Sequence, residues 1–228
     1  MRLHDLLLNA ALAAISWTPS LSQSTPQWTP RFGVIGGANW ATVSGGYFPK
    51  ASNRTGFAGG LIAVLPVAPR FAIQPELMFT LKGANSDSGG ISETGKFDYI
   101  ELPVLARFDI PTSGRVKPFI YGGPGVAYRT SCMLKAHYAI GAVYGIDGDH
   151  TVKCDELARQ GQRVSPGVEY RRTDVDGIIG GGFAFDIGNR TITAGVRYDA
   201  GFVNVFNRNG SKNRVLSFVG TLESAFRK

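Results

Sequence analysis

The sequence predicts an all-β protein, an eight-stranded antiparallel up-and-down transmembrane β-barrel. Three observations carry this prediction: long stretches alternate apolar and polar residues, short turns alternate with long connections, and lysines avoid the middles of the strands. The clearest stretch is TITAGVRYDAGF at 191–202, which alternates over its whole length. Such alternation is typical of a strand with one apolar face. The stretch also reaches the roughly 9–11 residues that a tilted strand needs to cross a bilayer.

Length and composition indicate one domain, at 25–228, because no change in composition divides the 228 residues beyond the N-terminal region. Hydrophobic residues make up 43% of the chain, yet no apolar run is long enough for a membrane helix, so any span must be β. The formal net charge of +7 is spread along the chain without basic clusters among aromatic residues. This scatter argues against nucleic-acid binding.

The N-terminal region, 1–24, is expected to be a secretory signal peptide. Arg2 supplies the positive start, the segment 6–17 (LLLNAALAAISW) the short apolar core, and Ser20 and Ser22 a small-residue cleavage site. A buried N-terminal helix is the alternative.

Eight strands are expected, with connections that alternate in length. The strands are placed at 31–43, 54–65, 70–82, 96–110, 116–130, 174–187, 190–204 and 213–226. Tight turns fall at 66–69, 111–115 and 188–189, and longer links at 44–53, 83–95, 131–173 and 205–212. Turns at one end and loops at the other are typical of outer-membrane barrels, whose turns are periplasmic and whose loops are outside. An even strand number places both termini at the periplasmic end.

The apolar strand faces are expected to point outward, toward lipid. A water-soluble barrel would direct its apolar face inward and cover its outside with lysine and glutamate. Here every lysine, Lys82 included, is assigned to a loop or a strand end. Aromatic residues gather at two levels, as in the girdles of membrane barrels: Trp40, Phe57, Phe79, Tyr128 and Phe202 toward the loops, and Phe32, Phe71, Phe108, Phe185 and Phe226 toward the turns.

Four prolines lie inside the expected strands: Pro75, Pro103, Pro118 and Pro124. Proline removes a hydrogen-bond donor from the ladder and is normally confined to edges or bulges. A closed barrel has no edges, so bulges or strand ends are expected at these positions.

Four segments in order resemble the outer-membrane β-barrel domain family that includes PorT-like and porin-family proteins of Gram-negative bacteria. They are QPELMFTLKG at 74–83, YIELPVL at 99–105, KPFIYGGP at 117–124 and GVRYDAGF at 195–202. The resemblance spans about 31–226 and implies a location and a fold, not a catalytic reaction. The chain departs from the family in its long loop at 131–173 and in ending on arginine and lysine after Phe226.

Candidate chemistry is sparse. His137 and His150 lie in the long loop without a serine two or four residues away, and the nearby Asp-Gly-Asp is read as a turn, so no catalytic set, cofactor or metal site is assigned. Charged residues on the polar strand faces are expected to fill a narrow lumen as ion pairs. They are Glu76, Glu101, Arg107, Asp109, Asp176, Arg197, Asp199 and Glu223.

Cys132 and Cys154, the only cysteines, fall in the same expected outer loop. An even pair in a secreted chain predicts a disulfide.

These observations favour a non-enzymatic barrel of the Gram-negative outer membrane, with a structural or adhesive role or limited passage of small solutes. The alternative is a barrel enzyme that acts on envelope lipid or polymer through loop residues; a soluble secreted lipocalin-like carrier is more remote. The expected partners are outer-membrane lipid and the barrel assembly machinery, and the expected state is a monomer.

Overall fold

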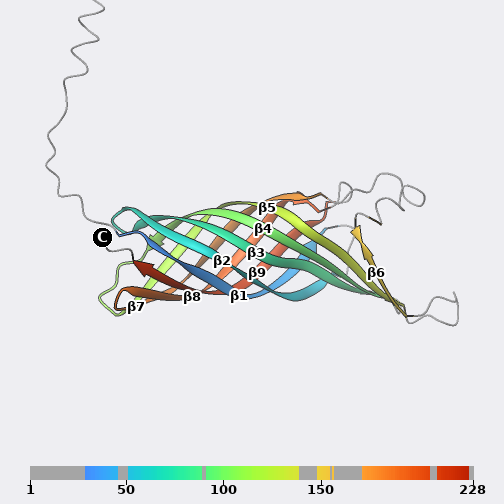
Figure 1. Ribbon diagram of the computed structural model, residues 1–228, viewed down its shortest axis with the longest axis horizontal. Coiled ribbons are helices and arrows are strands. Elements are labelled where there is room, and N and C mark those ends of the chain that lie inside the picture. Colours follow the sequence, from blue (N-terminus) through green and yellow to red (C-terminus); the bar gives the residue numbers. More distant parts are fainter. Residues whose placement is uncertain are drawn as a thin grey trace, which may run out of the picture.

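The computed structural model describes residues 29–45, 51–88, 91–138, 148–154, 156, 171–205 and 210–225; the expected signal peptide lies outside them. These residues form nine strands (Figure 1). They are β1 (Arg31–Ser44), β2 (Ser52–Ala68), β3 (Phe71–Ser88), β4 (Ile91–Asp109), β5 (Val116–Tyr138), β6 (Gly148–Lys153), β7 (Thr173–Ile187), β8 (Arg190–Asn204) and β9 (Lys212–Ala225).

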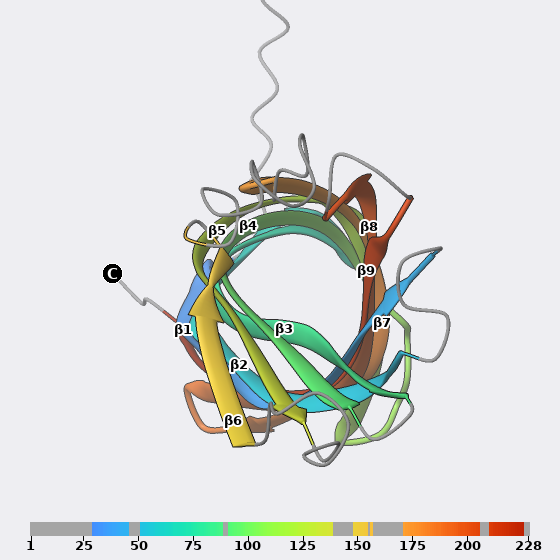
Figure 2. The same ribbon diagram turned by 90° about the vertical axis from the view of Figure 1, so that its right-hand side faces the viewer.

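Eight of these strands close into an antiparallel barrel, as Figure 2 shows end-on. The wall runs β4-β3-β2-β1-β9-β8-β7-β5, and the pairing of β4 with β5 completes the ring. The predicted eight-stranded barrel is therefore confirmed. The strand β6 lies outside the wall and pairs with the end of β5, from Met133 with Lys153 to Tyr138 with Gly148.

Two of the expected long links are wrong in part, because the residues described within them are largely strand. In place of a loop at 83–95, β3 and β4 stay paired up to Ser88 and Ile91. In place of a loop at 131–173, β5 continues to Tyr138 and is followed by β6. Strands that project beyond a membrane need no apolar face, so the alternation that identifies a strand is absent there. We refer to the paired segments 83–96, 131–138 and 148–153 as the outer extension.

The opposite end carries the tight turns. Gly188 and Asn189 connect β7 to β8, and Gly188 has a φ of +64° that suits such a hairpin. Between β2 and β3 the turn is formed by Pro69 and Arg70, because β2 continues through Pro66 to Ala68. The described chain begins and ends at this turn end, where the Ala225 amide donates to the carbonyl of Asn189.

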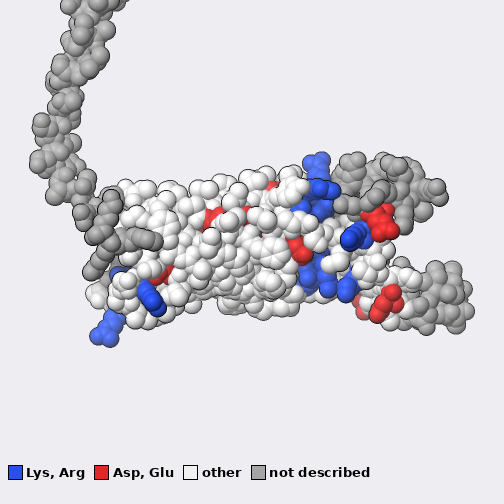
Figure 3. All heavy atoms as spheres, in the orientation of Figure 1, with Lys and Arg blue, Asp and Glu red and all other residues white. Residues whose placement is uncertain are grey.

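The outside of the barrel is apolar, as predicted. The exposed fraction is 65% for Ile179, 57% for Leu102 and 55% for Phe218, while the alternate residues along each strand face inward. In Figure 3 the middle of the barrel shows few charged atoms, and cations gather toward the outer extension. Among the described residues, no helix is long and apolar enough to span a membrane.

Aromatic side chains lie outward near both ends of this apolar belt. Phe57 packs beside Phe79 toward the outer extension, and Phe71 packs beside Phe108 toward the turns. Trp40 contacts Phe218 edge-on. Phe226, assigned to the turn-end level, lies outside the described residues.

The wall accommodates its prolines without the expected bulges at Pro75 and Pro103. Pro75 pairs with Val104 on β4, whereas the β2–β3 ladder lapses beside it between Ile62 and Leu65. Pro103 pairs with Gly125 on β5 in the same way, and its β3 side is unpaired. Each proline therefore lies where the pairing with one neighbouring strand is interrupted, so its missing N–H leaves no partner unpaired in a continuous ladder. The strand register is the same on either side of this gap.

Candidate functional site

Buried charged side chains line the barrel interior. Of the eight residues expected there, seven are buried and Asp109 is partly exposed near the turns. They come from β3, β4, β7, β8 and β9, and alternation along each strand turns them to the same side. Cross-barrel contacts join them into three groups at successive heights.

The middle group is built around Arg197 of β8. Its Nε donates to Asp199 Oδ1 at 2.7 Å, and its Nη1 donates to Glu76 Oε2 from β3. All three side chains are at most 5% exposed. The guanidinium therefore links two strands through charge-assisted hydrogen bonds in a space without solvent.

The group nearer the outer extension is built around Lys82, which corrects the assignment of every lysine to loops or strand ends. The Lys82 ammonium lies 2.7 Å from Glu101 Oε1 and 3.2 Å from Asp176 Oδ2, and its side chain is fully buried. Lys82 continues the inward series of β3 that includes Gln74 and Glu76. Its position in that series is the sequence signal that would have placed it inside.

The group nearest the turns is built around Arg107. Its Nε lies 2.8 Å from Asp109 Oδ1, and its Nη1 lies 3.8 Å from Glu223 Oε1. The guanidinium carbon stacks 3.8 Å from the ring centroid of Phe119, a cation–π contact. Glu223 is shared, because its Oε2 also accepts a 2.8 Å hydrogen bond from Arg31 Nε.

Side chains fill the space between these groups. A cavity of about 10 Å³ lies beside Arg107 and Tyr121, which is room for about one water. The close approach of the Tyr121 ring depends on Gly180, since a Cβ there would lie 2.6 Å from the tyrosine Cζ. The described interior is thus a packed core of ion pairs and apolar residues.

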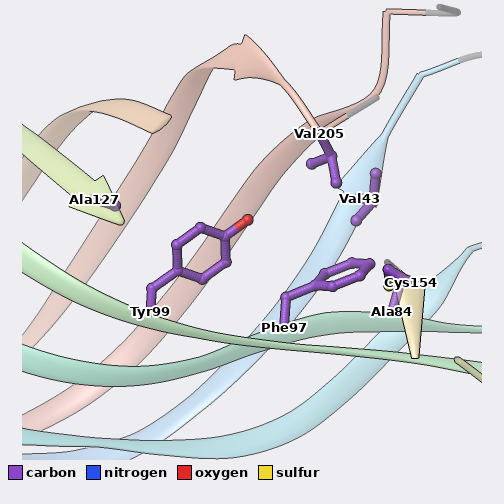
Figure 4. Close-up of a cluster of buried hydrophobic side chains, with 7 residues drawn as sticks. All are labelled: Val43, Ala84, Phe97, Tyr99, Ala127, Cys154 and Val205. Atoms are coloured by element: carbon purple, nitrogen blue, oxygen red, sulfur yellow. The ribbon is translucent and has the colours of Figure 1, made fainter. Parts of the chain in front are cut away.

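An apolar cluster covers the interior at the outer end (Figure 4). It comprises Val43, Ala84, Phe97, Tyr99, Ala127, Cys154 and Val205. Next to this cluster, Asn213 Nδ2 donates to Asp174 Oδ2 at 2.9 Å. Cys154 follows β6 and is fully buried in this cluster, so the outer extension contributes to closing the mouth.

The predicted disulfide is confirmed: Cys132 of β5 is bonded to Cys154, 22 residues later. The bond fixes the end of β6 against β5 beside the mouth of the barrel.

We expect the paired change Cys132→Ser with Cys154→Ser to leave the barrel assembled but to loosen the outer extension. Closing a loop of this length contributes on the order of 3 kcal/mol in the chain-entropy model, and the eight-stranded wall does not depend on it. Limited proteolysis of folded protein should therefore cut the variant between 131 and 173 faster than the parent, with the wall left intact. A wall that no longer assembles, or an unchanged cleavage rate, would contradict this expectation.

The structure also brings together three residues that sequence distance separates. Ser92 of β4 pairs in register with His137 of β5, and His137 pairs with Asp149 of β6. His137 Nδ1 lies 2.8 Å from Asp149 Oδ1. No hydrogen bond joins Ser92 to His137 among the described residues, and the His137 and Asp149 side chains are 56% and 87% exposed. Because Ser92 lies on the neighbouring strand, far from His137 in the sequence, residue spacing along one strand does not reveal this pairing.

His150 pairs in register with Ala136, next to this row, and Asp147 lies outside the described residues. Within the described part of the chain, no three His, Cys, Asp or Glu residues are grouped so that they could hold a metal ion.

Comparison with known proteins gives one family and several similar structures. The family described as outer membrane protein beta-barrel domain matches residues 22–207. Among curated proteins, no sequence matches.

Neisserial surface protein A is 14% identical, with a TM-score of 0.45 over 86% of this chain and 97% of that one. The attachment invasion locus protein Ail of Yersinia pestis is 14% identical, with a TM-score of 0.43 over 86% of this chain and 99% of that one. The outer membrane enzyme PagL is 13% identical, with a TM-score of 0.40 over 82% of this chain and 97% of that one. Likeness of this size says nothing about an activity.

Proposed function

The chain belongs to the outer membrane protein β-barrel domain family, and on that premise we propose that it is a non-enzymatic barrel with a structural or adhesive role. The observation that carries the proposal is the filled interior. Three groups of buried ion pairs, around Lys82, Arg107 and Arg197, occupy the lumen. An eight-stranded barrel has an interior only about wide enough for side chains, so steady solute passage is disfavoured.

We further propose that the outer extension lies outside the cell and that both termini are periplasmic. The support is the sorting of the connections: short turns at one end and projecting paired strands at the other. The extension, fastened by its disulfide, is then the part available for contact with other surfaces. The proposed partners are the surrounding lipid and the barrel assembly machinery, and the proposed state is a monomer.

Among the described residues, the row of Ser92, His137 and Asp149 is the arrangement closest to a catalytic set. An activated serine needs a hydrogen bond to its base and a site that excludes water. The row lacks the first among the described residues and is largely exposed. These two features favour the non-enzymatic proposal.

Purified protein in planar lipid bilayers is expected to show no steady conductance, because side chains occupy the lumen. Single-channel recording over a range of voltages tests this, with a known porin in the same bilayers as the positive control. Large, stable current steps from the purified monomer would overturn the proposal of a closed barrel.

A further inference from the structure

Three lysines lie on one face of the outer extension, on three neighbouring strands. In one cross-strand row, Lys96 of β4 is followed by Met133 of β5 and Lys153 of β6. In the next row outward, Lys135 stands between Thr94 and Thr151. Lys135 is therefore a diagonal neighbour of both other lysines, at about 7–8 Å between backbones.

This face points away from the mouth of the barrel. Phe97, the neighbour of Lys96 along β4, is buried in the apolar cluster that covers the interior. Cys132, which pairs with Phe97, turns to the same side and bonds Cys154. Lys96 and Lys135 must then project outward, and Lys135 and Lys153 are exposed.

The positive charge on this face is only partly balanced. Repulsion from Lys135, followed by partial burial and by Arg54, lowers the pKa of Lys96, and Asp98 opposes the shift. Two further acids, Asp87 and Asp149, lie on the face one row further out, and Asp149 is paired with His137. A groove of about 270 Å³ beside Lys135 is lined by Thr94 and Thr151 and also by Asp149. The Thr94 hydroxyl donates to Asn85 Oδ1, so Thr151 is the hydroxyl next to the ammonium that is left to donate to a ligand.

The height of the lysines above the apolar belt indicates which layer of the membrane their side chains contact. Lys96 lies four residues along β4 from Ile100, which is exposed in the belt. At about 3.3 Å per residue on a tilted strand, the Lys96 backbone is roughly 10 Å beyond the Ile100 backbone along the barrel. Figure 3 shows lysine and arginine gathered toward the end with the outer extension, next to a middle of the barrel with few charged atoms. The headgroup layer on each side of the hydrocarbon core is about 5–8 Å thick. The long lysine side chains reach this layer by extending from the strand toward the belt.

We propose that the face formed by Lys96, Lys135 and Lys153 binds the phosphate groups of the surrounding outer-leaflet glycolipid. Ammonium and hydroxyl donors match phosphate oxygens, and clustered cations gain most from a multiply charged anion. The inference rests on the proposed function, because it needs the outer extension to lie on the glycolipid side of the membrane. It adds a specific lipid contact that holds the extension against the leaflet.

The test measures binding of lipid A to the detergent-solubilised, folded protein, with fully dephosphorylated lipid A as the comparison. The variant is Lys96→Gln with Lys135→Gln and Lys153→Gln. The matched control removes three charges at the turn end: Arg115→Gln with Lys117→Gln and Arg190→Gln. We expect the parent to prefer the phosphorylated lipid and the variant to lose about tenfold to a hundredfold in affinity at low salt, with less than about twofold loss in the control.

Equal binding of the two lipids by the parent, or equal losses in the two variants, would overturn the inference. Inorganic phosphate that displaces the lipid at similar concentrations would also overturn it, by assigning the face to a free anion. Both variants are first checked for the change in gel mobility on boiling that marks a folded barrel. A parent that fails this check contradicts the proposed function, whereas a folded parent without phosphate preference contradicts this inference alone.

Discussion

Replacing Arg197 with leucine is expected to lower the free energy of unfolding by about 3–5 kcal/mol, because it leaves two buried carboxylates without their cation. Arg197 is 2% exposed, and its guanidinium is bonded to both Glu76 and Asp199. Leucine fills part of the volume but supplies neither charge nor hydrogen-bond donors. Urea-induced unfolding of the barrel in lipid vesicles, monitored by the gel mobility of unboiled samples, measures the difference.

The matched control is Arg190→Leu, in the same strand beside the turn. Arg190 is exposed, so its replacement should change the unfolding free energy by no more than about 0.5 kcal/mol. Similar losses at the two positions would mean that the interior ion pairs do not stabilise the barrel more than surface charge does.

Replacing Lys82 with methionine is expected to cost a similar amount, about 3–5 kcal/mol, and for the same reason. The Lys82 ammonium is the cation in contact with both Glu101 and Asp176. If the cost arises from uncompensated charge, making both acids neutral should remove it. The triple variant Lys82→Met with Glu101→Gln and Asp176→Asn should therefore recover most of the stability, as when buried ion pairs are replaced as a group.

Lys96→Met provides the control for this series, since Lys96 lies on the outward face of the neighbouring strand. Its replacement should leave the unfolding free energy nearly unchanged. A triple variant less stable than Lys82→Met would show that packing around the ammonium, and not charge balance, decides the stability at this height.

The wall of the barrel could be predicted because apolar and polar residues alternate along most of its strands, with glycine on both faces in the first two. Ile179 and Phe183 on β7 have polar or small residues between them, and the structure places both on the outside. The same alternation identified Arg107 and Arg197 as inward residues. In the part of a strand that faces lipid, every outward residue must suit an apolar surrounding, so the alternation of outward and inward residues can be read directly from the sequence.

Lys82 was assigned to a strand end because it is a lysine, although its position in the alternation along β3 indicates an inward side chain. Lysine is rarely buried unless it is paired, and its partners Glu101 and Asp176 lie 19 and 94 residues away in the chain.

The outer extension was missed for a different reason. Beyond the apolar belt the outward faces of β3 and β4 carry polar residues such as Asn85 and Thr94, so no alternation of apolar and polar residues identifies the strands there. The row of Ser92, His137 and Asp149 depends on that extension and was missed with it.

The most direct test of an apolar-out, charge-filled barrel is the gel mobility of the protein from outer-membrane fractions, with and without boiling. The expected result is that the protein sediments with the outer membrane, requires detergent for extraction, and migrates at a different position when the sample is not boiled, because the closed wall resists unfolding. A protein recovered from the periplasm as a monodisperse monomer without detergent would contradict it.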